Sequence, residues 1–143
     1  MKPPYCVMVS GSRDLTWGHM DLIVEQLRPY STRPLSLVIH GAGEGRNATV
    51  PGFDRVAAAA ARFLKMRCQG YPALWDLQSK VAGPDRNRLL AEILRAHALF
   101  GYAPVFLAFP TGGPGTASAI SAVESVSKRD SIPVEIQKFP ITL

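Results

Sequence analysis

The sequence contains few cysteines and histidines, and this argues against two common kinds of site. The 143 residues include two cysteines, Cys6 and Cys68, and three isolated histidines. They form no Cys-x-x-Cys pair and no other metal-ligand spacing, so we expect no bound metal. Both cysteines fall in segments that we predict to be buried strands separated by an intervening strand. That separation, roughly 9 to 10 Å, is beyond disulfide reach, so we expect two free, packed thiols without a catalytic role.

Long hydrophobic runs are also missing. No window approaches the roughly 18 apolar residues that a membrane helix needs, and residues 1–4 begin no signal-peptide hydrophobic segment. We therefore expect a cytoplasmic protein that does not contact membranes. Nearly half of the residues are apolar, which is enough for one domain with its own core over residues 1–143.

The third missing feature is a run of basic residues. The net charge is +5 and favours anionic partners, but the sixteen Lys and Arg are spread along the chain. The sequence also lacks the repeated pairing of aromatic residues with arginines that is typical of channels for single-stranded nucleic acid. This pattern suits a small anionic ligand at least as well as nucleic acid.

What the sequence does contain is a strand, a glycine turn and a helix in succession over residues 105–128. Val105 to Phe109 is an uncharged apolar run that predicts a central strand buried on both faces. Three glycines and a proline follow, and Thr116 is the predicted N-cap of the next helix. A helix start behind a glycine turn is a natural place for phosphate. The alternative is a glycine-rich connection without a ligand.

Strand and helix patterns alternate along the whole chain. Apolar runs predict strands at 6–9, 35–39, 65–69, 105–109 and 133–137. Helical periodicity follows Thr16, Gly52, Gly83 and Thr116, with Pro84 at the first position of the third helix. This predicts an α/β, Rossmann-like doubly wound parallel sheet of about five strands, with helices on both faces and strand order 3-2-1-4-5.

In such a sheet, ligands bind where the winding reverses, beyond the carboxyl ends of strands one and four. The turns 10–13 and 111–116 meet there, and the loop after the second strand lies beside them. The candidate ligand-binding residues are Gly11, Ser12, Arg13, His40, Gly41, Gly43, Arg86, Asn87, Thr111, Gly112, Gly113, Gly115 and Thr116.

Arg86 is a candidate because of its position on the third helix. The apolar stripe of that helix comprises Leu89, Leu90, Ile93 and Leu94. At 100° per residue, Arg86 projects from the middle of this stripe, so its guanidinium needs an anion or several acceptors. We expect it to contact the ligand; a structural pairing with Asp14, Asp54 or Asp76 is the alternative.

Four motifs occur in order along the chain: Gly11-Ser12-Arg13-Asp14, His40-Gly41-Ala42-Gly43, the stretch 82–88, and Ala108-Phe109-Pro110 before 113–116. Together they resemble the YspA branch, related to cpYpsA, of the SLOG superfamily, and Trp75 and Lys80 also match in position. The resemblance covers almost the whole chain. It implies a Rossmann-like domain that binds nucleotides or nucleotide-derived ligands, often as a homodimer. Apolar residues near Trp75 are our candidate for the dimer face. The superfamily includes the LOG phosphoribohydrolases and the DprA-type DNA-processing proteins.

The departures from this pattern bear on catalysis. LOG enzymes carry a glutamate three residues after the motif threonine, where this chain has Ala119, and Glu124 lies about 7.5 Å further along the helix. Binding, as a sensor or sequestering protein, is our first interpretation. Hydrolysis of an N-glycosidic bond stays open, with Asp54 and Asp85 as the catalytic candidates, although an acid in a first helical turn also complements the helix dipole. DprA-like DNA binding is the second alternative.

Overall fold

A five-stranded, all-parallel sheet forms the centre of the computed structural model, which describes residues 2–74 and 81–143. Its strands are β1 (Tyr5–Gly11), β2 (Leu37–His40), β3 (Arg67–Gly70), β4 (Ala103–Phe109) and β5 (Glu135–Lys138). Their order is β3-β2-β1-β4-β5, which confirms the predicted winding and its reversal between β1 and β4. The Rossmann-like, doubly wound α/β fold is therefore confirmed.

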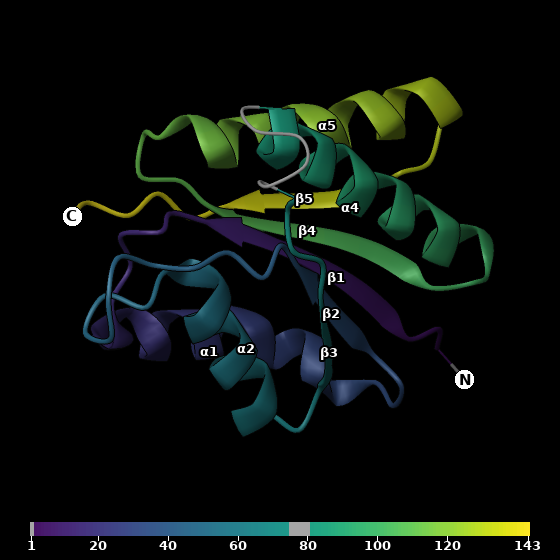
Figure 1. The fold of residues 1–143 in the computed structure, drawn as a ribbon. Coiled ribbons are helices and arrows are strands. Elements are labelled where there is room, and N and C mark those ends of the chain that lie inside the picture. Colours follow the sequence, from purple (N-terminus) through teal and green to yellow (C-terminus); the bar gives the residue numbers. More distant parts are fainter. Residues whose placement is uncertain (1, 75–80) are drawn as a thin grey trace.

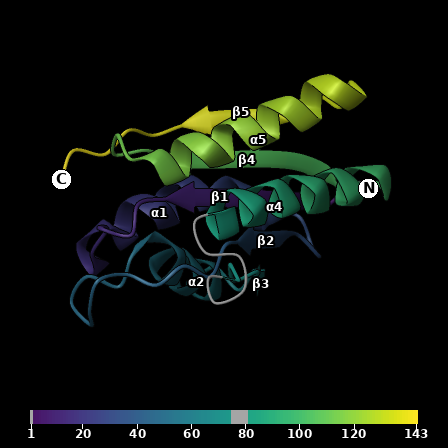
Figure 2. The same ribbon diagram turned by 45° about the horizontal axis from the view of Figure 1, so that its top comes forward.

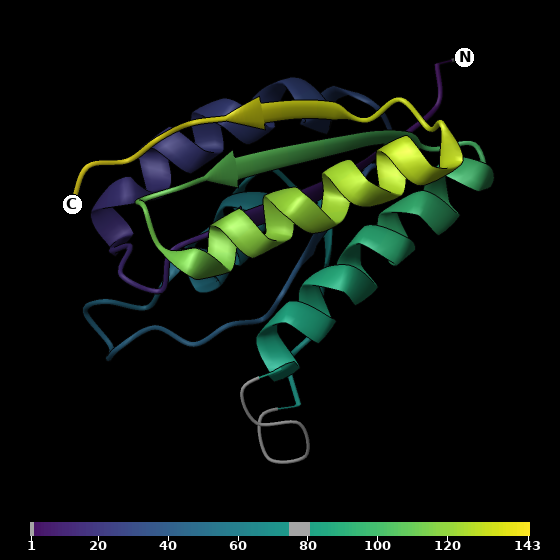
Figure 3. The same cartoon turned by 90° about the horizontal axis from the view of Figure 1, so that it is seen from above.

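In the part of the chain that the structure describes, two α-helices cover each face of the sheet. Figure 1 shows α4 (Ala82–Leu99) and α5 (Pro114–Asp130) above it, with α1 (Met20–Leu27) and α2 (Phe53–Phe63) below. From above, α4 and α5 run beside each other across the strands (Figure 3). In the turned view of Figure 2, the arrowheads of β1 and β5 point to the side of the molecule where the C-terminus of the chain lies. Short 3-10 turns at Trp17–His19 and Arg28–Thr32 flank α1.

The alternation of side chains along β1 explains why both faces are apolar. Val7 and Val9 pack with Ile23 and Val56 from the lower helices. Cys6 and Met8 pack with side chains of α4 and α5 on the other face. Because successive side chains of a strand point to opposite faces, a strand covered on both sides must be apolar throughout. The same holds for β4, whose residues from Val105 to Phe109 are all buried.

Two helices begin earlier than the sequence pattern predicts. Helix α5 starts at Pro114 with Gly113 as its N-cap, so Thr116 is a buried residue of the first turn and not the cap. Helix α4 starts at Ala82, which places Pro84 at its third position. Proline fits anywhere in a first turn because those N–H groups lack partners within the helix. The predicted start was therefore late by three residues for α5 and by two residues for α4.

Three apolar side chains are more exposed than predicted. Cys68 is exposed because β3 is an edge strand. Cys6 is buried as predicted, and burial raises the pKa of its thiol to about 12. Both cysteines are free. Leu89 is 52% exposed, because the side of α4 that faces the sheet is centred on Leu90 and Leu94. Phe63 follows Val56 and Ala60 at helical spacing, which predicts a place in the core, but it is the last residue of α2 and is 63% exposed.

Among residues 2–74 and 81–143, no helix is both long enough and apolar enough to cross a membrane. The same part of the chain contains no group of three or more His, Cys, Asp or Glu side chains placed to hold a metal ion.

Candidate functional site

A cleft of about 1400 Å³ opens where the winding of the sheet reverses. Four parts of the chain line it: the loop after β1, the loop after β2 with the start of α2, the first turn of α4, and the first turn of α5. Residues 72–74 add to its rim. The position follows from topology, since the carboxyl ends of β1 and β4 adjoin and their loops turn to opposite faces.

Most of the predicted ligand-binding residues lie at this cleft. Those that line it are Gly11, Ser12, Arg13, Gly43, Arg86, Asn87, Gly113, Gly115 and Thr116. Four others, His40, Gly41, Thr111 and Gly112, are not part of its lining. Of the two catalytic candidates, Asp54 lines the cleft, whereas Asp85 forms an ion pair with Arg88 away from the lining.

The first turn of α2 is docked against the loop after β1. The N–H of Phe53 donates to the Ser12 carbonyl at 2.9 Å, and the N–H of Gly52 donates to the Leu15 carbonyl at 3.0 Å. A Cβ at Gly11 would lie 2.4 Å from the Phe53 ring, so only glycine fits there. Gly11 therefore brings α2, and with it Asp54, close to β1.

The guanidinium of Arg86 reaches the loop after β2. Its Nη1 donates to the Gly41 carbonyl at 2.5 Å, and its Nε donates to Oδ1 of Asn87 at 3.0 Å. A Cβ at Gly41 would lie only 2.0 Å from Nη1, so Gly41 leaves the space that the guanidinium occupies. Within residues 2–74 and 81–143, Arg86 forms no ion pair, and Asp14 is instead paired with Arg46. The positive charge of Arg86 faces the cleft.

Asn87 links the second turn of α4 to the N-terminal end of α5. Its side chain is 4% exposed. Its Nδ2 donates to the Gly115 carbonyl and to Ser118 Oγ, each at 3.2 Å, while its Oδ1 accepts from Arg86. Because both amide hydrogens and the amide oxygen are used, Asn87 fixes the position of the Arg86 side chain relative to the start of α5.

Replacing Asn87 with alanine is expected to lower the free energy of unfolding by about 1 to 3 kcal/mol, because buried partners lose their hydrogen bonds. Urea unfolding of the ligand-free protein measures the change. Ser118→Ala, which removes only one of these partners, serves as the comparison and should cost less. Equal stability of the Asn87→Ala and parent proteins would contradict a linking role.

His40 and Asp54 lie near each other beneath the loop after β2. His40 is 8% exposed, and its Nδ1 accepts a hydrogen bond from the N–H of Ala42 at 2.9 Å. Burial lowers the pKa of His40, and the nearby charge of Arg86 lowers it further, against the opposing effect of Asp54. His40 thus holds the loop after β2 through this hydrogen bond, and its imidazole ring is neutral.

Asp54 is partly exposed, toward the cleft, and its Oδ2 accepts a hydrogen bond from the N–H of Gly43 at 2.8 Å. Burial raises the pKa of its carboxyl above the usual range, although the Gly43 N–H, the His40 ring and the positive charge of Arg86 oppose this. The protein therefore keeps a carboxyl group in a poorly solvated place, where its charge is costly.

A pH dependence of stability follows from this raised pKa. The folded state binds the Asp54 proton more tightly than the unfolded state, so this group makes folding less favourable as pH rises from about 4 through its folded pKa. Asp54→Asn keeps an acceptor for Gly43 and removes the charge. We expect the variant to melt at a higher temperature than the parent at pH 7, with the difference vanishing toward pH 4. Melting curves across that range are the measurement, and a constant difference would contradict the assignment.

Ala119, at the position where LOG enzymes carry a glutamate, supplies no carboxylate to the cleft. Ala119 is fully buried and packs in the core between α5 and the sheet. Glu124 is exposed further along α5 and does not line the cleft.

Some cleft residues were not among the predicted ones. Asp14 and Arg46 form an exposed ion pair at the rim, although 32 residues separate them in the sequence. Glu44, Phe53 and Ser118 also line the cleft. The polar composition of the two loops was visible in the sequence, but only the path of residues 46–51 brings them together. Trp75, Lys80 and Asp76 lie outside the described residues, so the dimer contact near Trp75 stays a prediction.

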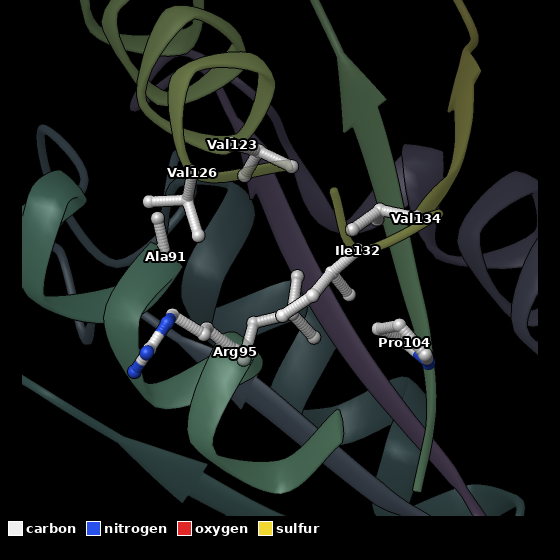
Figure 4. A pocket seen from close by; sticks show the side chains of 8 residues that line it. Ala91, Arg95, Pro104, Val123, Val126, Ile132 and Val134 are labelled. Atoms are coloured by element: carbon white, nitrogen blue, oxygen red, sulfur yellow. The ribbon is translucent and has the colours of Figure 1, made fainter. Parts of the chain in front are cut away.

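A second hollow lies between α4, α5 and β4 and does not resemble a ligand site. Figure 4 shows its mostly apolar lining, which includes Ala91, Val123, Val126 and Val134. Its volume is about 10 Å³, barely enough for one water molecule. It is a packing void, so the cleft at the strand ends is the candidate site.

Comparison with known proteins adds no relative: no family model, no curated protein and no solved structure matches this chain.

Proposed function

We propose that the protein binds a nucleotide or nucleotide-derived ligand in the cleft between β1 and β4, as a sensor or sequestering protein. The anionic part of the ligand lies against the first turn of α5, and Arg86 contacts it from the second turn of α4. The four motifs that resemble the YspA branch of the SLOG superfamily support this proposal, because they contribute much of the cleft lining.

The observation that carries the proposal is the presence of two glycines that the fold itself does not require. Among the described residues, no atom outside the adjoining backbone would lie within 4 Å of a Cβ at Gly113 or Gly115, and neither residue has a positive φ. Gly115 lies inside a helix, where glycine is less favourable than alanine by about 0.5 to 1 kcal/mol. Both line the cleft. A ligand that approaches the backbone closely accounts for glycine at these positions.

The direct test begins with the protein as it is purified. Denaturing fresh protein and identifying the released small molecules by mass spectrometry should yield an intact nucleotide derivative. In a thermal-shift panel of nucleotides and cyclic nucleotides, members of the same chemical class as the released molecule should then raise the melting temperature of the protein. An empty protein that no member of the panel stabilises would contradict the proposal.

Hydrolysis is a second candidate, which one observation favours. Asp54 presents a carboxyl group to the cleft in surroundings that raise its pKa, as a group that moves protons near neutral pH requires. Incubation with nucleoside monophosphates should then release free base and ribose phosphate, and Asp54→Asn should abolish the release. Recovery of unchanged nucleotide over long incubations would leave binding as the function.

Salt dependence separates the pocketed nucleotide from DNA. The charged side chains of the cleft lining are Arg13, Arg46 and Arg86 against Asp14, Glu44 and Asp54, which is no strongly positive surface. We expect nucleotide affinity to fall by about tenfold or less between 50 and 200 mM salt, as one or two phosphate contacts imply. Titration calorimetry measures it. A loss of about a thousandfold, together with tighter binding of long oligonucleotides, would favour a DprA-like role.

A further inference from the structure

Asp54 has one carboxylate oxygen engaged and one open to the cleft. Oδ2 accepts the N–H of Gly43, whereas none of the described residues donates a hydrogen bond to Oδ1. The described structure leaves no buried side-chain oxygen without a partner, so Oδ1 must be reachable from the cleft, which Asp54 lines. The carboxylate therefore presents a fixed, unused acceptor.

The other acidic side chains of the cleft differ from Asp54 in this respect. Asp14 is paired with Arg46 at the rim, and Glu44 is exposed on the loop after β2. Asp54 forms no ion pair with any described residue, although the His40 ring and the charge of Arg86 lie close enough to affect its pKa. It is thus the acid that the fold holds in place, through the Gly43 N–H, while one oxygen is left for a group in the cleft.

The chemistry of that acceptor restricts its partner. An ionised carboxylate only accepts hydrogen bonds and repels phosphate, so the group that meets Oδ1 must be an uncharged or cationic donor. A guanine edge would offer two parallel donors and would compete with Gly43 for Oδ2. A single hydroxyl needs only Oδ1.

The geometry of α4 relates this acceptor to the proposed anion site. Arg86 is bonded to Gly41, near the Asp54 wall, and the adjacent Asn87 is bonded to Gly115 in the wall formed by α5. One turn of α4 therefore connects the two walls, and we expect a single sugar phosphate to reach both.

We propose that Oδ1 of Asp54 accepts a hydrogen bond from a ribose hydroxyl of the ligand, so that the protein selects ribonucleotides over deoxyribonucleotides. This inference rests on the proposed nucleotide binding, with the phosphate at the first turn of α5 and the sugar turned toward α2.

The test compares the four ribonucleoside 5′-monophosphates with their 2′-deoxy and 3′-deoxy counterparts by titration calorimetry, on the parent protein and on Asp54→Asn. In the parent protein, removal of the recognised hydroxyl should weaken binding about 10- to 100-fold, as expected for a hydrogen bond to a charged group. In Asp54→Asn, the preference should shrink to within a few fold. Circular dichroism checks that the variant folds, and the parent data stand without it.

Each other outcome identifies what fails. Equal binding of ribo- and deoxyribonucleotides to the parent overturns the hydroxyl contact and leaves the proposed function standing. A preference that persists unchanged in Asp54→Asn overturns the role of Asp54. Binding of guanine nucleotides alone, lost in the variant whatever the sugar, shows that Asp54 contacts the base instead. Failure of all these nucleotides to bind the parent overturns nucleoside monophosphate binding, and this inference with it.

Discussion

Replacing Arg86 with alanine is expected to weaken nucleotide binding by about 100-fold or more and to leave the fold intact. The guanidinium faces the cleft without an ion-pair partner among the described residues, so its charge is available for the anionic part of the ligand. Two charge-assisted hydrogen bonds to a phosphate account for a loss of this size. In the ligand-free protein, the variant loses bonds to Gly41 and Asn87, which costs about 1 kcal/mol each.

Arg88 provides the matched control, because it is the same residue type two positions further along α4. It pairs with Asp85 and does not line the cleft. Arg88→Ala should bind nucleotide with nearly parental affinity, while Arg86→Ala shows no ligand-induced rise in melting temperature. Equal rises in the parent and Arg86→Ala proteins would remove Arg86 from the site.

Gly115→Ala is expected to stabilise the ligand-free protein and to weaken nucleotide binding strongly. The added methyl group meets no atom within 4 Å, and alanine is the better helix former by about 0.5 to 1 kcal/mol. The same methyl group would occupy the space in which the phosphate approaches the backbone of α5, so affinity should fall by about 100-fold, the loss expected when two charge-assisted hydrogen bonds are broken. Urea unfolding and thermal shift on one protein preparation measure the two opposite effects.

Gly101→Ala is the control for this glycine effect. A methyl group at Gly101 would also meet no atom within 4 Å, but the φ of +97° at this position strains any other residue. This substitution should therefore destabilise the protein by about 1 to 2 kcal/mol and leave binding unchanged. If Gly115→Ala bound nucleotide as the parent does, the first turn of α5 would not be the anion site.

The two acids at helix starts show what sequence reasoning can and cannot separate. Asp54 and Asp85 both lie in first turns and are equivalent candidates by sequence. The structure places Asp54 at the cleft and Asp85 beside Arg88. Similarly, Gly41 was predicted to contact the ligand, but it lies outside the cleft lining and accommodates the Arg86 side chain. These differences depend on contacts between segments that lie far apart in the sequence.

The sequence by itself determined the order of strands and helices, the strands buried on both faces, and the two turns that meet between β1 and β4. These follow from local periodicity and from the handedness of parallel crossovers, which act within one strand and helix at a time. Only the tertiary structure decided that Asn87 holds α5, that Arg46 pairs with Asp14, and that Asp54 keeps an open oxygen. Such contacts depend on how distant loops pack together, and local periodicity carries no information about that packing.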